Sequence, residues 1–403
     1  MTWWIPENQL SENQNILINC CVLENNDYVW LRGFPGSGKT LLLLHIAIRL
    51  LSHNLKAKIG VITYTNSLAD LLCSCPFFDD QPDNVIFNSH VSFYLNNRKH
   101  FDYIFIDEIQ DIPIHHLAKI KTMGDKIYFA GDFDQTIYPQ RCSISELRAL
   151  FNPLAEYHLT EVFRLTPNVF ALAKRVAGDN GVESEVALNP KNPNIKLIEV
   201  GDSEKYEEVV WIVENALKLA QPGQPSAILF QCHDDIFDFG LYLTTYFEQK
   251  YKIKSYGPIL HFGSSEDAYR SFNDTCKRHG LFFRYLNYYS AKFAESEGIP
   301  LVYLSTIHNA KGLEFNNVFL PSLTQGAFVD SEKVKGWNLF LVAITRTREN
   351  LFITYPTHNY FDYIDQSPAS ICSKLWLKDL IHPPTVKKEE GPAEEEEDEG
   401  IVF

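Results

Sequence analysis

The stretch Tyr28-Val29-Trp30-Leu31-Arg32-Gly33-Phe34-Pro35-Gly36-Ser37-Gly38-Lys39-Thr40 decides the fold. Its first five residues predict a short buried strand, and a helical pattern starts at about Leu41. The segment between them fits G-x-x-x-x-G-K-[ST], in which glycines let successive backbone N–H groups face phosphate oxygens. Lys39 adds a positive charge at the outer phosphates, and the Thr40 hydroxyl can bind Mg²⁺. The sequence therefore predicts a site for ATP and Mg²⁺ built from Gly33, Gly36, Ser37, Gly38, Lys39 and Thr40.

Two acidic residues follow a second apolar strand. The segment Phe101-Asp102-Tyr103-Ile104-Phe105-Ile106 ends directly before Asp107 and Glu108. Downstream of a phosphate loop, Asp107 can hold Mg²⁺ through water, and Glu108 is placed to orient and deprotonate an attacking water. A kinase would seldom need the second acid, so the pair favours hydrolysis by water over phosphoryl transfer to a substrate.

Strand patterns alternate with helical patterns, which predicts α/β domains with parallel sheets covered on both faces. Two such series occur in tandem, so we expect a first domain at 1–160 and a second at 161–386. Within the second, residues from about 237 to 298 are less regular and rich in Tyr and Phe, which predicts a short insertion or lid. The expected strands are 28–32, 59–64, 102–106 and 126–130, then 195–200, 227–231, 301–306, 317–321 and 351–355.

Charge is distributed unevenly along the 403 residues. The formal net charge is −15, and the segment 387–403 holds eight acidic residues and two lysines. This composition predicts a disordered tail, which is either a solvating appendage or a competitor of nucleic acid for a basic groove. Because the rest of the chain is also acidic, binding to nucleic acid must use a local basic or aromatic groove.

The composition argues against a membrane-spanning, secreted or zinc-binding protein. No run of about 18 apolar residues occurs, and the N-terminus lacks the basic start and apolar core of a secretory signal. The eight cysteines are irregularly spaced, and Cys73-Ser74-Cys75 has no second pair at zinc-finger spacing. We therefore expect reduced cysteines and a cytoplasmic location.

Further motifs follow the two acids. They are Ile109-Gln110-Asp111, Gly131-Asp132-Phe133-Asp134-Gln135-Thr136-Ile137-Tyr138, Val162-Phe163-Arg164, Thr306-Ile307-His308-Asn309-Ala310-Lys311-Gly312-Leu313-Glu314-Phe315 and Val342-Ala343-Ile344-Thr345-Arg346-Thr347-Arg348. With the phosphate loop, this ordered set resembles the UvrD/Rep branch of the superfamily 1 helicases, from about Leu10 to Tyr355. The resemblance implies two tandem RecA-like P-loop NTPase domains.

The resemblance implies how ATP is held beyond the phosphate loop. Gln14, in Leu10-Ser11-Glu12-Asn13-Gln14, would hydrogen-bond the adenine edge, and Phe163 would stack on the ring. Glu314 would contact the ribose, and the backbone of Gly312 would approach the phosphates.

It also implies catalytic roles at the γ-phosphate. Gln135 resembles the sensor that couples this phosphate to the nucleic-acid track, and Arg164 and Arg346 would reach it from the second domain. A loose phosphoryl transition state needs charge stabilisation, which a guanidinium fork supplies. Hydrolysis would then depend on closure of the cleft, and repeated closure can become stepping along a strand. The predicted catalytic residues are Lys39, Asp107, Glu108, Gln135, Arg164 and Arg346.

Contacts to a single strand are implied as well. The segments Thr63–Asn66 and Asn88–His90 resemble those that line the single-strand groove. Aromatic rings stack on bases with little regard to sequence, at about 1–3 kcal/mol per base. The alternative is that these aromatics pack the domain core at strand ends. The predicted nucleic-acid residues are Tyr64, Asn66, His90, Tyr138 and His308.

The chain departs from the family pattern in several respects. Gln140 stands where the family usually has a tryptophan after the segment Gln135–Tyr138. Leu41 follows Thr40, where the family usually has an arginine. Only 17 positions separate His90 from Asp107, where the full helicases carry a whole accessory domain. We therefore expect a compact motor core with a complete ATP site and a reduced capacity for processive unwinding.

Two functions of different classes follow. The first is an ATP-dependent DNA helicase or translocase that moves on single-stranded DNA, or alternatively RNA, in DNA repair, recombination or phage defence. The resemblance implies 3′→5′ polarity. The alternative is a nucleotide-gated ATPase subunit that controls a partner nuclease and unwinds little itself. A P-loop kinase would leave Gln135, Arg164 and Arg346 without a role.

Overall fold

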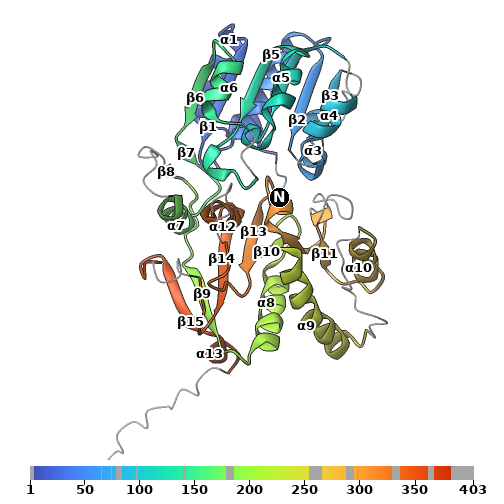
Figure 1. The fold of residues 1–403 in the computed structure, drawn as a ribbon, viewed down its shortest axis with the longest axis vertical. Coiled ribbons are helices and arrows are strands. Elements are labelled where there is room, and N and C mark those ends of the chain that lie inside the picture. Colours follow the sequence, from blue (N-terminus) through green and yellow to red (C-terminus); the bar gives the residue numbers. More distant parts are fainter. Residues whose placement is uncertain are drawn as a thin grey trace, which may run out of the picture.

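Two parallel β-sheets, one in each half of the chain, form the framework of the protein (Figure 1). The first sheet consists, in spatial order, of β3 (Val85–Ser89), β2 (Ile59–Thr63), β4 (Phe101–Ile106), β5 (Gly124–Ala130), β1 (Tyr28–Gly33) and β6 (Ala155–Leu159). The second consists of β11 (Phe283–Tyr285), β12 (Val302–Thr306), β10 (Ser226–Phe230), β13 (Phe315–Leu320), β14 (Thr347–Pro356), β9 (Ile195–Val200) and β15 (Cys372–Trp376). Between the sheets, β7 (Glu161–Val162) pairs with β8 (Val186–Ala187).

The computed structural model describes residues 4–64, 66–73, 75–78, 84–96, 99–138, 142–177, 186–253, 266–286, 295–296, 298–328, 336–361 and 367–382. The predicted disordered tail at 387–403 lies outside these residues. Within them, no helix combines the length and the apolar character needed to cross a membrane.

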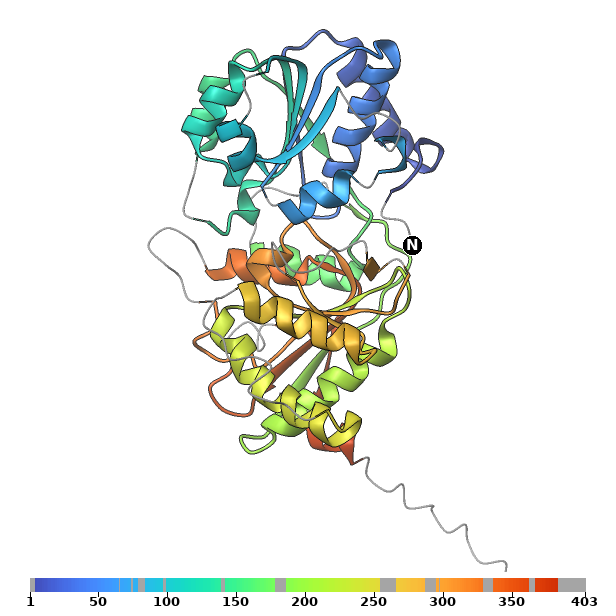
Figure 2. The same cartoon turned by 90° about the vertical axis from the view of Figure 1, so that its right-hand side faces the viewer.

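Helices pack on both faces of each sheet (Figures 1 and 2). In the first half they are α1 (Glu12–Leu23), α2 (Lys39–His53), α3 (Asn66–Cys73), α4 (His90–Asn96), α5 (Ile114–Lys121) and α6 (Ile144–Leu150). In the second half they are α7 (Pro167–Ala177), α8 (Lys205–Leu219), α9 (His233–Tyr251), α10 (Glu266–Arg278), α11 (Ile307–Ala310), α12 (Gly336–Ile344) and α13 (Leu377–Ile381). Burial on both faces explains why central strands such as β2 and β10 are buried at every position.

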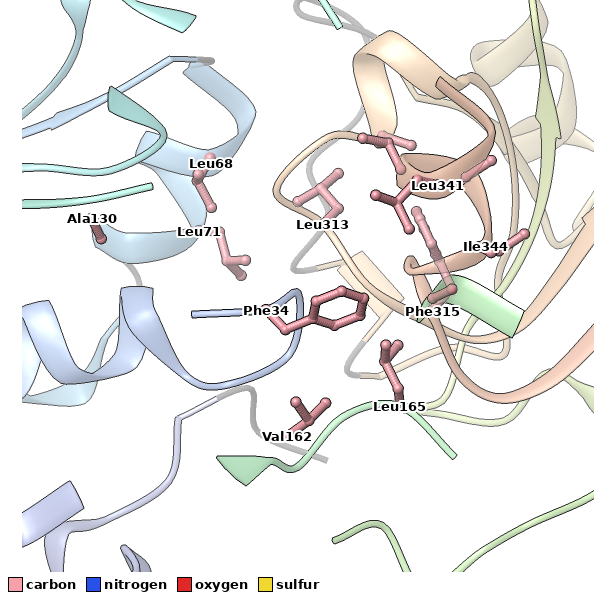
Figure 3. Packing of buried hydrophobic residues seen from close by; sticks show 14 of the residues in the cluster. Phe34, Leu68, Leu71, Ala130, Val162, Leu165, Leu313, Phe315, Leu341 and Ile344 are labelled. Atoms are coloured by element: carbon pink, nitrogen blue, oxygen red, sulfur yellow. The ribbon is translucent and has the colours of Figure 1, made fainter. Parts of the chain in front are cut away.

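The two halves share one hydrophobic core where they meet (Figure 3). Phe34 of the phosphate loop lies edge-on to Phe170 of α7, with ring centroids 5.3 Å apart. Leu68 of α3 lies so close to Gly312 that a Cβ on that glycine would be 2.9 Å from Leu68 Cδ2. Leu313 belongs to the same cluster. The residues around the phosphate loop are therefore packed directly against the second domain.

The predicted fold class is confirmed, because the chain forms two tandem α/β units with parallel sheets. All nine predicted strands are present, within a few residues of their expected limits. The sequence did not predict β3, β6, β11 and β15, and these four are the outermost strands of the two sheets. The strands β3, β6 and β15 leave part of their surface in water, so they lack the continuous apolar run that marks a central strand. The strand β11 is buried but spans only three residues, with Arg284 at its centre.

The predicted domain limits, 1–160 and 161–386, remain predictions. The first sheet ends with β6 at Leu159, and the second begins along the chain with β9 at Ile195. The described part of 237–298 contains most of α9, then α10 and β11. β11 pairs in parallel with β12, and Leu243 and Phe247 of α9 are buried in the same core cluster as Phe283. This part of the predicted insertion therefore packs on the second sheet.

Candidate nucleotide cleft and nucleic-acid track

The phosphate loop connects β1 to α2. Gly36 and Gly38 have φ angles of +83° and +89°, which residues with a side chain rarely adopt. A Cβ on Gly36 would lie 2.6 Å from the Cβ of Arg164. The backbone N–H groups of Phe163 and Arg164 donate to the Gly36 carbonyl at 2.9 and 3.3 Å. Glycine at position 36 thus lets the start of the second domain touch the loop.

Lys39, the first residue of α2, is hydrogen-bonded to its own loop. Its Nζ donates to the carbonyls of Gly33 at 2.7 Å and Phe34 at 3.1 Å. Burial lowers the pKa of this ammonium, although nearby carboxylates favour its charged form. Within the described residues, the fully buried Ser37 Oγ has no hydrogen-bond partner. Buried hydroxyls are normally hydrogen-bonded, and a phosphate oxygen in the loop would satisfy this one.

Thr40 and Asp107 meet beside the loop, just beyond the carboxyl end of β4. Thr40 Oγ1 donates to Asp107 Oδ2 at 2.6 Å. Burial and the neighbouring Glu108 raise the pKa of Asp107 to about 6, because a carboxylate removed from water needs compensating positive charge. A hydroxyl and a carboxylate are the hard oxygen ligands that Mg²⁺ takes beside a phosphate group. The two residues therefore fit the predicted metal site.

Glu108 lies next to this pair in a left-handed backbone conformation, with φ of 54°. Its carboxylate accepts a hydrogen bond from Gln110 Nε2 at 2.5 Å. Burial opposes ionisation, but the positive charges of Lys311, Lys39 and Arg346 outweigh it and lower the pKa of Glu108. Glu108 is therefore ionised at neutral pH, as a group that takes a proton from water must be.

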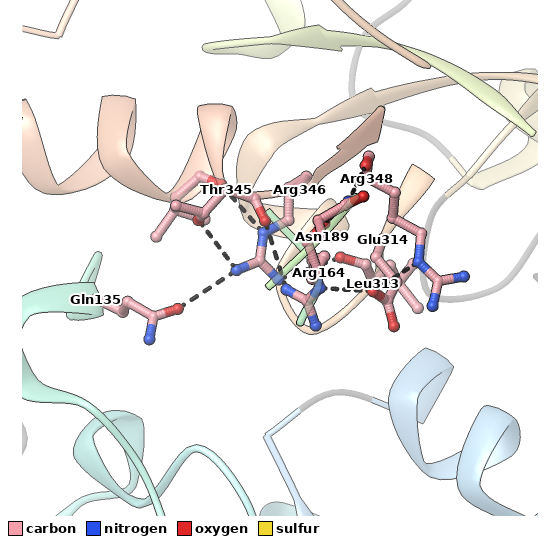
Figure 4. Close-up of polar contacts among 9 residues, drawn as sticks. Gln135, Arg164, Asn189, Leu313, Glu314, Thr345, Arg346 and Arg348 are labelled. Atoms are coloured by element: carbon pink, nitrogen blue, oxygen red, sulfur yellow. Dashed lines mark hydrogen bonds and ion pairs between the residues drawn. The ribbon is translucent and has the colours of Figure 1, made fainter. Parts of the chain in front are cut away.

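Arg346 reaches Gln135 across the cleft (Figure 4). Its side chain is buried and donates to the carbonyls of Val342 at 3.0 Å and Leu313 at 3.1 Å. Its Nη2 donates to Gln135 Oε1 at 3.3 Å. Burial and the nearby Arg164 lower the pKa of Arg346 to about 10, so the group remains charged at neutral pH. The predicted arginine and the predicted sensor are thus in contact.

Glu314 lies between two other arginines (Figure 4). Arg164 Nε donates to Glu314 Oε2 at 2.5 Å, and Arg348 Nε lies 3.2 Å from the same oxygen. Asn189 Nδ2 donates to the backbone carbonyls of both arginines, at 2.6 and 2.9 Å. Sequence reasoning assigned Glu314 to the ribose and overlooked Arg348, which lines the cleft.

The ion pairs of Glu314 predict that part of the free energy of unfolding depends on pH. Burial opposes ionisation of Glu314, but Arg164 and Arg348 outweigh it and lower its pKa to about 2. This carboxylate then stabilises the fold above about pH 4.5, and the stabilisation is lost as the pH falls toward 2. We expect Glu314→Gln to lower the free energy of unfolding in urea by on the order of 3 kcal/mol at pH 7, and by less than half as much at pH 3.

Glu349, near the start of β14, is the control for that measurement. Glu349 pairs with Lys191 at 2.6 Å, and the lysine is half exposed. Exposed pairs of this kind contribute about 0–1 kcal/mol, so Glu349→Gln should change little at either pH. If Glu314→Gln lowered the free energy of unfolding equally at pH 3 and pH 7, the ionised Glu314 carboxylate would not be the source of the pH dependence.

Gln14 borders the phosphate loop from the N-terminal side. It closes the first turn of α1 by a reciprocal capping box with Ser11. Its side chain is 4% exposed, and its Nε2 donates to the Ser37 carbonyl at 3.5 Å. A pocket of about 310 Å³ is lined by Gln14, Ser37 and Phe163. The two residues predicted to bind adenine therefore share one pocket.

The predicted nucleotide residues converge on one larger cleft of about 460 Å³ between the domains. Ser37 lines the smaller pocket beside it, and Gly33 accepts the Lys39 hydrogen bond behind it. The predicted residues that line the cleft are Gln14, Gly36, Gly38, Lys39, Thr40, Asp107, Glu108, Gln135, Phe163, Arg164, Gly312, Glu314 and Arg346.

A buried ion pair between the domains was not predicted. Lys311 Nζ lies 2.5 Å from Asp111 Oδ2, and the two side chains are 2% and 0% exposed. The same Nζ donates to the backbone carbonyl of Gln135 at 2.6 Å. Both charged residues lie within the motifs quoted above, but no sequence pattern links two positions so far apart. Lys311 thus ties the second domain to both ends of the segment from Asp111 to Gln135.

Four of the five predicted nucleic-acid residues form one series of ring contacts, which we call the ring track. Tyr64 stacks on His90, with centroids 5.0 Å apart, and contacts Tyr138 at 4.5 Å. Tyr138 in turn contacts His308 of the second domain at 5.6 Å. The side chain of Asn66 and the whole of Gln140 lie outside the described residues. The role of the track in binding nucleic acid stays a prediction.

Comparisons with known proteins agree with the motif order. The UvrD-like helicase C-terminal domain matches residues 277–358, and the viral superfamily 1 RNA helicase core domain matches residues 29–209. A probable DNA helicase of Mycoplasma pneumoniae is 26% identical over 268 residues, covering 62% of this chain and 43% of that protein. DNA helicase II of Rickettsia typhi is 27% identical over 169 residues, covering 38% and 24%.

Among solved structures, the chain is similar to arterivirus nonstructural protein 10, a helicase in complex with DNA. The match covers 84% of this chain and 63% of the viral chain. Its identity is 14% and its TM-score is 0.42, too low for any functional conclusion. The chain spans less than half the length of the two curated relatives described above. Its family matches and its ordered motifs together support a UvrD/Rep-like superfamily 1 helicase.

Proposed function

We propose that this protein is an Mg²⁺-dependent ATP hydrolase that moves on single-stranded DNA. One observation supports the proposal most strongly. Gln135 accepts a hydrogen bond from Arg346 in the cleft, and Tyr138 of the ring track lies three residues further along the chain. A change at the γ-phosphate and a change at the strand would therefore act on the same short segment. Such a link is what a motor requires, since hydrolysis must bias a two-state element that also grips its track.

In the proposed reaction, the first domain holds the nucleotide. Lys39 would exchange its own loop carbonyls for the outer phosphates, and Thr40 and Asp107 would hold the metal ion. Glu108 accepts the proton of the attacking water, and Gln110 keeps its carboxylate in place. When bound, Mg²⁺ neutralises charge that develops on the phosphate oxygens.

The second domain supplies the remaining positive charge. Arg346 hydrogen-bonds Gln135 across the cleft, so it would supply its positive charge to the γ-phosphate when the cleft closes. Arg164 is held by Glu314, and a ribose hydroxyl that hydrogen-bonds Glu314 would compete for this carboxylate. An arginine supplied at the γ-phosphate contributes about 10³–10⁵-fold to kcat in related chemistry. Hydrolysis would therefore require both a bound nucleotide and a closed cleft.

The decisive experiment measures ATP turnover with and without single-stranded DNA, single-stranded RNA and duplex DNA. We expect single-stranded DNA to stimulate turnover most. Strand displacement on duplexes with a 3′ or a 5′ tail then tests the proposed 3′→5′ polarity. Turnover that no single strand stimulates would refute the motor and favour the nucleotide-gated regulatory ATPase, which would control a partner nuclease. Absence of any turnover would refute both. The pathway, whether repair, recombination or phage defence, is a further proposal that these assays do not address.

A substitution at the centre of the ring track tests the strand contact. Tyr64 contacts both His90 and Tyr138 in the ring track, so Tyr64→Ala should weaken single-stranded DNA binding by about 1–3 kcal/mol, the value of one stacked base. Tyr64→Phe keeps the ring and should bind nearly as well as wild type. Tyr251→Ala, at the end of α9 in the second domain, is a control for loss of a partly exposed tyrosine. Fluorescence anisotropy of a labelled oligonucleotide measures all four proteins, and unchanged binding by Tyr64→Ala would refute the contact.

A further inference from the structure

The helices α4 and α5, with the segments that flank them, form an acid-free region in an acidic protein. The chain has a formal net charge of −15, yet residues 85–100 and 112–124 contain no Asp or Glu. The same two segments contain four lysines and arginines and four histidines: Arg98, Lys99, Lys119, Lys121, His90, His100, His115 and His116. A local positive region is what an acidic protein needs in order to bind a polyanion.

Ring contacts connect this region to the ring track. His90, the last member of the track on this side, lies 5.5 Å from His116 of α5. His116 stacks on Tyr94 of α4, with centroids 4.0 Å apart and planes 23° from parallel. His115 packs edge-on against His116 at 4.5 Å. The series of aromatic side chains that begins at His308 in the second domain thus continues onto the surface of α4 and α5.

This surface, which we call the α4–α5 face, is exposed and partly apolar. Val91 and Leu95 lie one turn apart on α4 and are 46% and 65% exposed. His115 is also exposed. Lys119 Nζ lies 4.2 Å from the centre of the Tyr94 ring and donates to the Tyr94 carbonyl at 2.7 Å. The face therefore combines rings, apolar side chains and a fixed positive charge within one small area.

Acidic residues flank the second segment, with Asp111 before it and Asp125 after it along the chain. Asp125, at the start of β5, lies 2.8 Å from His100, and both side chains are more than half exposed. Lys121 belongs to α5 but not to the face. Its Nζ donates to the Leu150 carbonyl at the end of α6 and lies over the Tyr28 ring. The positive charge on the face itself is therefore that of Lys119.

We propose that single-stranded DNA continues from the ring track over the α4–α5 face, with bases against His115 and Leu95 and phosphate near Lys119. This rests on the proposed function and extends its strand site. The occupant follows from charge complementarity and from continuity with the ring track. Rings next to a cation are the usual combination in grooves that bind single strands without sequence preference. A protein partner would also cover exposed apolar residues, and the test below separates the two.

The test compares oligothymidines of increasing length bound to wild type and to His115→Ala, Leu95→Ser and Lys119→Ala. Short oligonucleotides that fill only the ring track should bind all four proteins alike. For longer ones, His115→Ala should bind about tenfold more weakly, within the range for one lost base stack. Lys119→Ala should reduce the slope of log affinity against log salt by about 0.7, the value for one phosphate contact on a single strand.

Lys121→Ala is the matched control, since it removes the same charge from the same helix on a different side. It should leave both the affinity and the salt slope near wild type. Thermal unfolding of each variant verifies that the fold is intact. Equal losses for Lys119→Ala and Lys121→Ala, or equal affinities of wild type and His115→Ala at every length, would overturn the proposal. If wild type binds short oligonucleotides but gains nothing with length, the α4–α5 face serves another partner. If it binds no oligonucleotide at all, the proposed function itself fails.

Discussion

Replacing Glu108 with Gln is expected to slow ATP hydrolysis by about 10²–10⁴-fold, the usual contribution of a general base. Gln has the same shape but cannot accept the proton of the attacking water. Glu108 is ionised in the protein because Lys311, Lys39 and Arg346 outweigh the effect of burial. Since these groups remain in Glu108→Gln, ATP should still bind. Single-turnover hydrolysis and equilibrium binding of a fluorescent ATP analogue measure the two effects separately.

A substitution of Lys39, in the same nucleotide site, should impair the protein in a different way. Lys39→Ala removes the positive charge at the outer phosphates, so it should weaken ATP binding as well as hydrolysis.

The control for Glu108→Gln is Glu207→Gln, in the exposed first turn of α8, which makes the same change of a carboxylate to an amide. A Glu108→Gln protein that hydrolysed ATP at the wild-type rate would exclude Glu108 as the base.

Replacing Lys311 with Met should destabilise the closed arrangement of the two domains by about 3–5 kcal/mol. The reason is that Asp111 would keep a buried negative charge without its partner, and breaking a buried pair from one side carries that cost. Lys311 lies 2.5 Å from Asp111 and also donates to the Gln135 carbonyl. Urea unfolding measures the loss, and hydrogen exchange of the segment from Asp111 to Gln135 should locate it.

The double variant Lys311→Met, Asp111→Leu separates stability from coupling. Replacing both members of a buried pair by apolar residues is often nearly neutral, so most of the lost stability should return. Stimulation of turnover by single-stranded DNA should stay impaired, because the hydrogen bond from Lys311 to the Gln135 carbonyl is still missing. Full recovery of the stimulation would show that the pair serves stability alone.

How much of the fold could be predicted depended on burial. Central strands such as β1 and β10 are covered on both faces, so they are continuous apolar runs that a pattern detects. The outermost strands are different. In β15 only Cys372 is buried, and its neighbours are partly or fully exposed. Its pairing with β9 is made by backbone hydrogen bonds, which leave no mark in the side-chain pattern.

The sequence by itself determined the chemical groups of the nucleotide site. The phosphate loop needs glycines, a lysine and a hydroxyl at fixed spacing within one strand–loop–helix unit, so local order suffices to define it. Similarly, Asp107 and Glu108 follow directly from the end of their own strand. These residues are recognisable because the geometry that they require is local.

Only the tertiary structure decided which groups face one another between the domains. Lys311 meets Asp111, Arg348 shares Glu314 with Arg164, and Tyr94 stacks on His116. Each contact depends on how separate helices or the two sheets pack, and packing depends on the summed shape of many side chains rather than on any local spacing. The sequence therefore specified an ATP site, whereas the contacts that would make hydrolysis respond to a strand emerged only when the two domains were packed together.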